Sequence, residues 1–179
     1  MGGLAPIAGG FVFAGYASLV GLSEDALYGG TLRVLFIVFL LSWLAGMVAL
    51  HLLQWERPRY GLAGAIVAAT AFLGVALIVV GYIINLDGLG ATLFLLGVLV
   101  ATLGIIGLGL VTFSVGVLPW WGGAALIAGT PLLAVLIILI FIGSYPHFGG
   151  WLVAVPWIVV GFAVVLAAGR RTQRPPRVR

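Results

Sequence analysis

Cysteine and lysine are both absent from this chain of 179 residues, and only 7% of its residues are charged. Without cysteine there are no disulfides, thiolate nucleophiles, iron–sulfur ligands or cysteine zinc sites. Without lysine there is no Schiff base to retinal or to pyridoxal phosphate, and no glycine-rich phosphate loop that ends in lysine. These two absences remove several large classes of enzyme and cofactor protein.

Apolar residues, by contrast, make up 64% of the chain. A water-soluble protein of this length cannot cover its surface with so few polar side chains, so the expected solvent is lipid. The net charge of +4 comes from arginines beside apolar segments, which favours a membrane surface and not a nucleic acid as partner. In composition alone the chain resembles multi-span proteins of GC-rich bacteria, a resemblance that implies no functional residue.

The chain contains apolar segments long enough to cross a bilayer, whose hydrocarbon core takes roughly 20 helical residues. The segments cover residues 4–22, 31–54, 61–84, 89–118, 122–143 and 150–168. They lack the alternating pattern of a membrane β-barrel. We therefore predict an all-α fold with six transmembrane helices in residues 1–168 and a basic cytoplasmic tail in residues 169–179. The first segment has no basic region before it, so we expect a retained span and not a cleaved signal.

Arginine placement predicts the orientation of this bundle. With six spans, Arg33 lies alone on one side of the membrane. The other side holds both termini and the remaining seven arginines, which are Arg57, Arg59, Arg170, Arg171, Arg174, Arg177 and Arg179. The positive-inside rule then makes both termini cytoplasmic, in a membrane of the bacterial cytoplasmic type. We expect the seven arginines to contact anionic lipid at this face; for those of the tail, an acidic cytoplasmic partner is the alternative.

The stretch "LHLLQWERPRYG", residues 50–61, concentrates polar groups in an otherwise apolar chain. A membrane boundary explains most of it, because Trp55 and Tyr60 suit the headgroup belt and Pro58 ends a helix. His51 and Gln54 are left over, and for them a hydrogen bond to a neighbouring helix or to a lipid headgroup competes with a binding role. His147 is expected on the opposite side of the membrane, so His51 could hold haem only in a symmetric dimer.

The expected spans carry little that could do chemistry. All four carboxylates fall in connections between spans, so no central acidic group is available for ion coupling. No zinc-protease or serine-hydrolase motif is present either, and we predict that the protein is not an enzyme. Pro131 and Pro156 lie inside spans, where each makes either a static kink or a hinge.

Small residues recur at four-residue spacing, as at Gly97 and Ala101, and such rows let helices approach closely. Packing within one chain is the expected role, and self-association is the alternative. A faint similarity at a shift of 61 residues also suggests a repeated helix pair, aligning for example Pro58 with Pro119.

We therefore expect a small integral membrane protein without a cofactor that handles an apolar or uncharged partner, as a permease-like or accessory membrane subunit. Two alternatives stay open. One is a membrane electron carrier that binds haem through His51, and the other is a purely structural subunit of a larger membrane complex. A homo-oligomer is compatible with each of these interpretations.

The predicted topology can be tested by accessibility labelling, because the chain has no cysteine of its own. Single Arg57→Cys and Arg179→Cys variants should react with a membrane-impermeant maleimide from the same face of sealed vesicles, and Asp87→Cys from the other face. Labelling of positions 57 and 179 from opposite faces would contradict the six-span topology.

Overall fold

The computed structural model describes residues 4, 7–8, 30–84, 88–141 and 149–172, and these contain five long helices. They are α2 (Gly30–Trp55), α3 (Gly61–Ile84), α4 (Leu89–Val115), α5 (Trp120–Phe141) and α6 (Gly149–Thr172). The expected segment 61–84 coincides with α3, and the other four helices match their segments within a few residues at each end. The first expected span, residues 4–22, lies almost wholly outside the described residues.

The all-helical expectation is confirmed for the described part of the chain. Three of its helices, α2, α3 and α4, are long and apolar enough to cross a membrane. As expected, α4 is the longest, with 27 residues. These features are those of a multi-pass membrane protein, because a helix satisfies its own backbone hydrogen bonds in lipid.

The connections between helices follow from their sequences. Helix α2 ends at Trp55, shortly before Pro58, and the Arg57 N–H donates to the Gln54 carbonyl at 2.8 Å. Helix α4 ends at Val115 and is capped by Gly116, whose φ of 65° is a left-handed conformation that favours glycine. The Gly116 N–H donates to the Thr112 carbonyl. Both connections are therefore short and reverse the chain direction.

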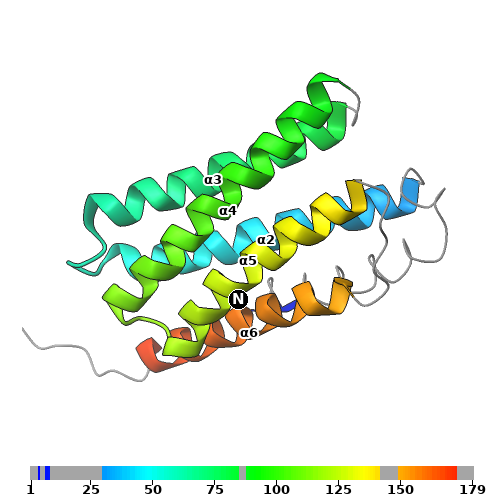
Figure 1. The fold of residues 1–179 in the computed structure, drawn as a ribbon. Helices are drawn as coiled ribbons and strands as arrows, with labels where there is room; N and C mark the ends of the chain where they lie inside the picture. Colours follow the sequence, from blue (N-terminus) through cyan, green and yellow to red (C-terminus); the bar gives the residue numbers. More distant parts are fainter. Residues whose placement is uncertain (1–3, 5–6, 9–29, 85–87, 142–148, 173–179) are drawn as a thin grey trace, which may run out of the picture.

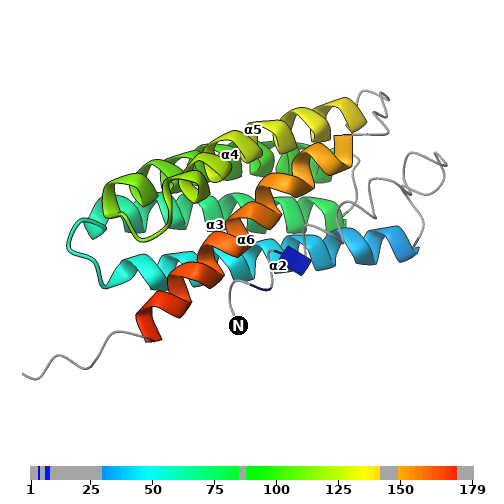
Figure 2. The same cartoon turned by 90° about the horizontal axis from the view of Figure 1, so that it is seen from below.

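The helices form a ring in which each contacts two neighbours. The pairs in contact are α2 with α3, α3 with α4, α4 with α5, α5 with α6, and α6 with α2. Figures 1 and 2 show the α2–α3 connection, the α4–α5 connection and the end of α6 at the same end of the bundle. We call this end the connection end.

Helices α3 and α4 make the closest contact of the bundle, at small residues. A Cβ atom placed on Gly97 of α4 would lie 2.6 Å from the backbone nitrogen of Ile78 and 2.8 Å from the carbonyl oxygen of Gly74. Similarly, a Cβ on Gly81 would lie 2.5 Å from the backbone nitrogen of Phe94. The small-residue row at Gly97 and Ala101 thus packs within the chain, since Ala101 faces Gly74 of α3.

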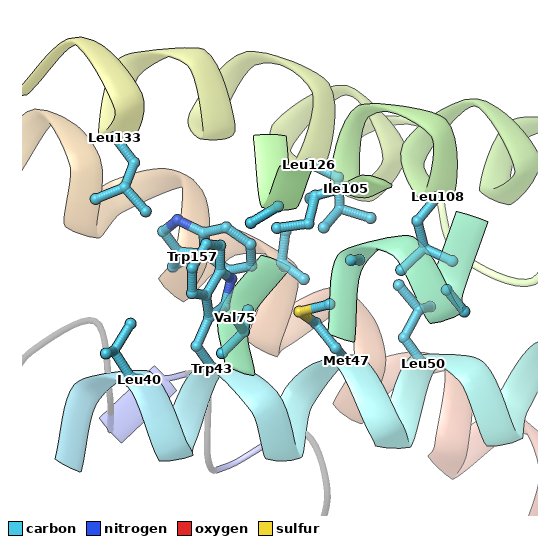
Figure 3. Close-up of a cluster of buried hydrophobic side chains, with 14 of the residues drawn as sticks. Leu40, Trp43, Met47, Leu50, Val75, Ile105, Leu108, Leu126, Leu133 and Trp157 are labelled. Carbon is cyan, nitrogen blue, oxygen red and sulfur yellow. The ribbon is translucent and has the colours of Figure 1, made fainter. Parts of the chain in front are cut away.

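Helix α2 faces the ring interior with one stripe of residues. The stripe repeats at alternating intervals of four and three, as in a coiled coil, and consists of Phe36, Leu40, Trp43, Met47, Leu50 and Gln54. Figure 3 shows Trp43, Met47 and Leu50 pointing toward residues of the other helices, among them Trp157 of α6. The opposite side of α2 exposes large apolar side chains such as Leu41 and Leu52, which suits contact with lipid.

The spacing of helix starts differs by two residues from the 61-residue shift of the suggested repeat. The interval from the start of α2 at Gly30 to the start of α4 at Leu89 equals the interval from the start of α3 at Gly61 to the start of α5 at Trp120. The α2–α3 and α4–α5 pairs are therefore comparable in length and order along the chain.

The α3–α4 contact predicts a cost for a single methyl group. Gly97→Ala should lower the free energy of unfolding by about 1–3 kcal/mol, because the added Cβ meets backbone atoms that cannot rotate away. Unfolding in mild detergent by heat or by added denaturing detergent measures the change. Gly169→Ala is the matched control, since a Cβ at Gly169 of α6 meets no atom within 4 Å; an equal loss in both variants would contradict the close approach.

Candidate functional site

Polar side chains of the described residues gather at the connection end of the ring. We refer to His51, Gln54, Trp55, Tyr60 and Thr112 as the polar cluster. The first three lie in the last two turns of α2, Tyr60 directly precedes α3, and Thr112 lies near the end of α4. The cluster therefore connects α2, α3 and α4 close to the points where α2 and α4 end and α3 begins.

Gln54 and Thr112 form a hydrogen bond that crosses the ring from α2 to α4. The Gln54 amide Nε2 donates to the Thr112 hydroxyl at 2.6 Å, and this hydroxyl donates to the Leu108 carbonyl at 2.7 Å. Both side chains are completely buried. The Gln54 carbonyl oxygen Oε1 is also buried and has no hydrogen-bond partner, so it remains an acceptor that faces the interior without a donor.

His51 is held by aromatic residues and by one hydrogen bond. Its Nδ1 lies 2.5 Å from the Tyr60 hydroxyl oxygen. The centroid of its ring lies 5.3 Å from the ring centroid of Trp55 and 6.1 Å from that of Phe72. The sequence left a hydrogen bond or a ligand role open for His51, and the structure shows the hydrogen bond. Its partner, Tyr60, directly precedes the next helix.

The direction of this hydrogen bond bears on the haem alternative. The Tyr60 hydroxyl hydrogen needs an acceptor in its buried position, and His51 Nδ1 is the acceptor at hand. When Tyr60 donates, the other ring nitrogen of His51 carries the hydrogen and presents no lone pair to a metal. With Tyr60 as the donor, the arrangement favours a structural role of His51 over that of an iron ligand.

Tyr60 is placed differently from the expectation of a residue in the headgroup belt. It is 1% exposed, because its ring covers Gly64, where a Cβ would lie 2.5 Å from the tyrosine ring. Burial raises the pKa of Tyr60 to about 12 from an ordinary value of 10.0, so its hydroxyl stays protonated at all physiological pH values. Trp55 is 59% exposed, and its expected position in the headgroup belt stays a prediction.

Arg57, Arg59, Arg170 and Arg171 lie at the connection end, whereas Arg33 lies in the first turn of α2, at the other end of that helix. Arg59 is exposed and donates to the Ser114 carbonyl at 3.4 Å, which links the α2–α3 connection to the end of α4. Arg57 is half-buried, and Arg170 is exposed on the last turn of α6. Arg171 lies in the same turn, without a described side chain. The other predicted lipid-contact residues, Arg174, Arg177 and Arg179, lie outside the described residues.

A shallow depression of about 310 Å³ opens beside the polar cluster. Its lining residues are Trp55, Glu56, Arg57, Pro58, Tyr60 and Gly61. The depression thus has one acidic, one basic and two aromatic residues in its lining, at the point where α2 ends and α3 begins.

A second group of polar atoms lies deeper, where α2 meets α6. The ring centroids of Trp43 and Trp157 are 4.7 Å apart, and the two ring planes make an angle of 80°. Both are 3% exposed, and both indole N–H groups lack a hydrogen-bond acceptor. Figure 3 shows the two rings against each other inside the bundle. Pro156, expected inside a span, precedes Trp157 within α6, and Pro131 likewise lies within α5.

Sequence reasoning missed two parts of this site. Thr112 is one of several threonines in apolar segments, and nothing in its neighbourhood marks it as the partner of Gln54, 58 residues away. The Trp43–Trp157 pair is also invisible in the sequence, because nothing near either tryptophan marks the other as its partner, 114 residues away. In the described ranges no three side chains of histidine, aspartate or glutamate come together as a metal site, and His147 lies outside these ranges.

Comparisons of the chain with protein-family models, with curated proteins and with solved structures find no match. The function is therefore argued from the geometry of the described residues.

The Gln54–Thr112 contact predicts a non-additive pair of substitutions. Thr112→Val should lower the free energy of unfolding by about 1–3 kcal/mol, because it leaves the buried Gln54 amide without an acceptor. The double variant Gln54→Leu/Thr112→Val should recover most of this loss, since both polar groups are then gone. Thermal unfolding in detergent measures each variant.

Thr70→Val serves as the matched control, because the Thr70 hydroxyl donates only to the Ile66 carbonyl of its own helix. We expect a change of less than about 0.5 kcal/mol for this substitution. Losses that simply add in the Gln54–Thr112 double variant would contradict the ring-crossing hydrogen bond.

Proposed function

We propose that this protein is a non-catalytic, multi-pass integral membrane protein that handles an apolar or uncharged partner, as a permease-like or accessory membrane subunit. The observation that carries the proposal is the pair of unpartnered indole N–H groups of Trp43 and Trp157 inside the ring. These groups offer hydrogen bonds to a neutral acceptor at a depth where a charge would be costly.

The chemistry of the interior supports an uncharged partner. Among the described residues, the buried polar side chains are Gln54, Thr112 and Thr130, and each of them is neutral. Thr130 donates to the Leu126 carbonyl of its own helix at 2.7 Å, so its hydroxyl is already occupied. A carbonyl or ether oxygen on an apolar molecule would complement the two indoles, whereas an ion would find no buried countercharge among these residues.

The proposal includes six membrane spans with both termini on the cytoplasmic side. Support comes from the shared position of Arg57, Arg59 and Arg170 at the connection end, as the charge rule requires of one face. The membrane is proposed to be a bacterial cytoplasmic membrane, with anionic lipid against the exposed arginines. A homo-oligomer or a larger membrane complex is compatible with the apolar outer faces of α3 and α4.

The proposal predicts that the partner stays bound to the purified protein through hydrogen bonds from the indole N–H groups of Trp43 and Trp157. Protein extracted in mild detergent should carry an uncharged molecule or a partner subunit in native mass spectrometry. Trp43→Phe and Trp157→Phe should each lower the retained fraction by about threefold to tenfold, because each removes one hydrogen-bond donor and keeps an aromatic ring.

Trp120→Phe is the matched control, since Trp120 is 73% exposed and lies outside the ring interior. Unchanged retention in this variant, together with loss in the other two, supports the proposal. Equal retention in all three variants would contradict it. A Soret band at stoichiometric intensity that disappears in His51→Gln would replace it with the haem alternative.

A further inference from the structure

We propose that the depression at the α2–α3 connection binds the headgroup of a zwitterionic phospholipid that carries a primary ammonium, that is, an ethanolamine-type phospholipid. This site is separate from the indole pair in the ring interior and does not depend on the function proposed above. It also differs from the general attraction between exposed arginines and anionic lipid, because an acidic residue, Glu56, lines the depression.

The position of the depression fits a headgroup. Helices α2 and α3 are both long and apolar enough to cross a membrane, so the connection between them lies at the level of the lipid headgroups. Trp55 lines the depression and is 59% exposed, as a tryptophan of the interfacial belt would be. The volume of about 310 Å³ falls at the lower end of the range for small-molecule sites.

The phosphate part of such a headgroup has two complementary features. Arg57 lines the depression and is half-buried, and a guanidinium can bind two phosphate oxygens at once. Helix α3 begins at Gly61 in the same lining, and its first backbone N–H groups carry the positive end of the helix dipole. Gly61 has a φ of 47°, so glycine is required by the backbone, and its missing side chain keeps the helix start open.

The ammonium part has its complement in Glu56, the neighbour of Arg57 in sequence and in the lining. A carboxylate accepts hydrogen bonds from a primary ammonium, which has three N–H donors. A choline headgroup has no N–H to donate, and a phosphoglycerol headgroup carries the same phosphate charge but no ammonium to pair with Glu56. One acid and one base side by side therefore select a headgroup that carries both opposite charges.

The test is competition between lipids on the full-length protein. Protein in mild detergent is mixed with equimolar phosphatidylethanolamine, phosphatidylcholine and phosphatidylglycerol of identical acyl chains, and retained lipid is counted by native mass spectrometry. We expect one phosphatidylethanolamine to be retained preferentially. Glu56→Gln should bring the preference over phosphatidylcholine to about one, and Arg57→Gln should lower retention of phosphatidylethanolamine by about tenfold.

Arg170→Gln is the matched control, because it removes the same charge from the same end of the bundle but outside the depression. Its retention of phosphatidylethanolamine should equal that of the unsubstituted protein. Glu56→Asp, which keeps the carboxylate, should preserve the preference and shows whether a loss in Glu56→Gln reflects charge or folding. Preferential retention of phosphatidylglycerol, or equal effects of Arg57→Gln and Arg170→Gln, would overturn the assignment.

Discussion

Lipid does not press apolar helices together, because the lipid tails are as apolar as the side chains that the helices present. Contacts inside this bundle therefore depend on close packing of small residues and on a few polar pairs. The α3–α4 contact shows the first of these, since Gly97 meets the backbone of α3 directly. The Gln54–Thr112 hydrogen bond shows the second, and it joins helices that are not neighbours in the ring.

The same constraint explains why polar chemistry collects at the connection end. Charged groups are costly in the hydrocarbon layer, so Glu56, Arg57 and Arg59 occupy the turn between α2 and α3. Neighbouring residues at this turn form contacts with other helices. The Tyr60 hydroxyl reaches back to His51, and Arg59 reaches the end of α4 at Ser114. A membrane boundary and a binding site are thus compatible interpretations of one short stretch.

The two proposals concern two polar sites of different chemistry. The Trp43–Trp157 pair offers neutral donors deep in the ring, where only an uncharged molecule is accommodated at low cost. The depression at Glu56 and Arg57 has an acidic and a basic residue in its lining, at the connection that the proposed topology puts at the headgroup level. A partner in the interior and a lipid at the rim therefore differ in chemistry and can be measured independently.

The sequence alone determined the solvent, the helical class and the approximate ends of five described helices, because the cost of burying polar backbone in lipid leaves a long apolar run few alternatives. It also located Pro58 and the arginines at a boundary. It could not tell which face of α2 turns inward, since Leu41 on the outside and Leu40 on the inside are equally apolar. Only the tertiary structure decided that, and with it the pairing of Gln54 with Thr112, the burial of Tyr60 and the meeting of two tryptophans, because each depends on which surfaces of different helices touch.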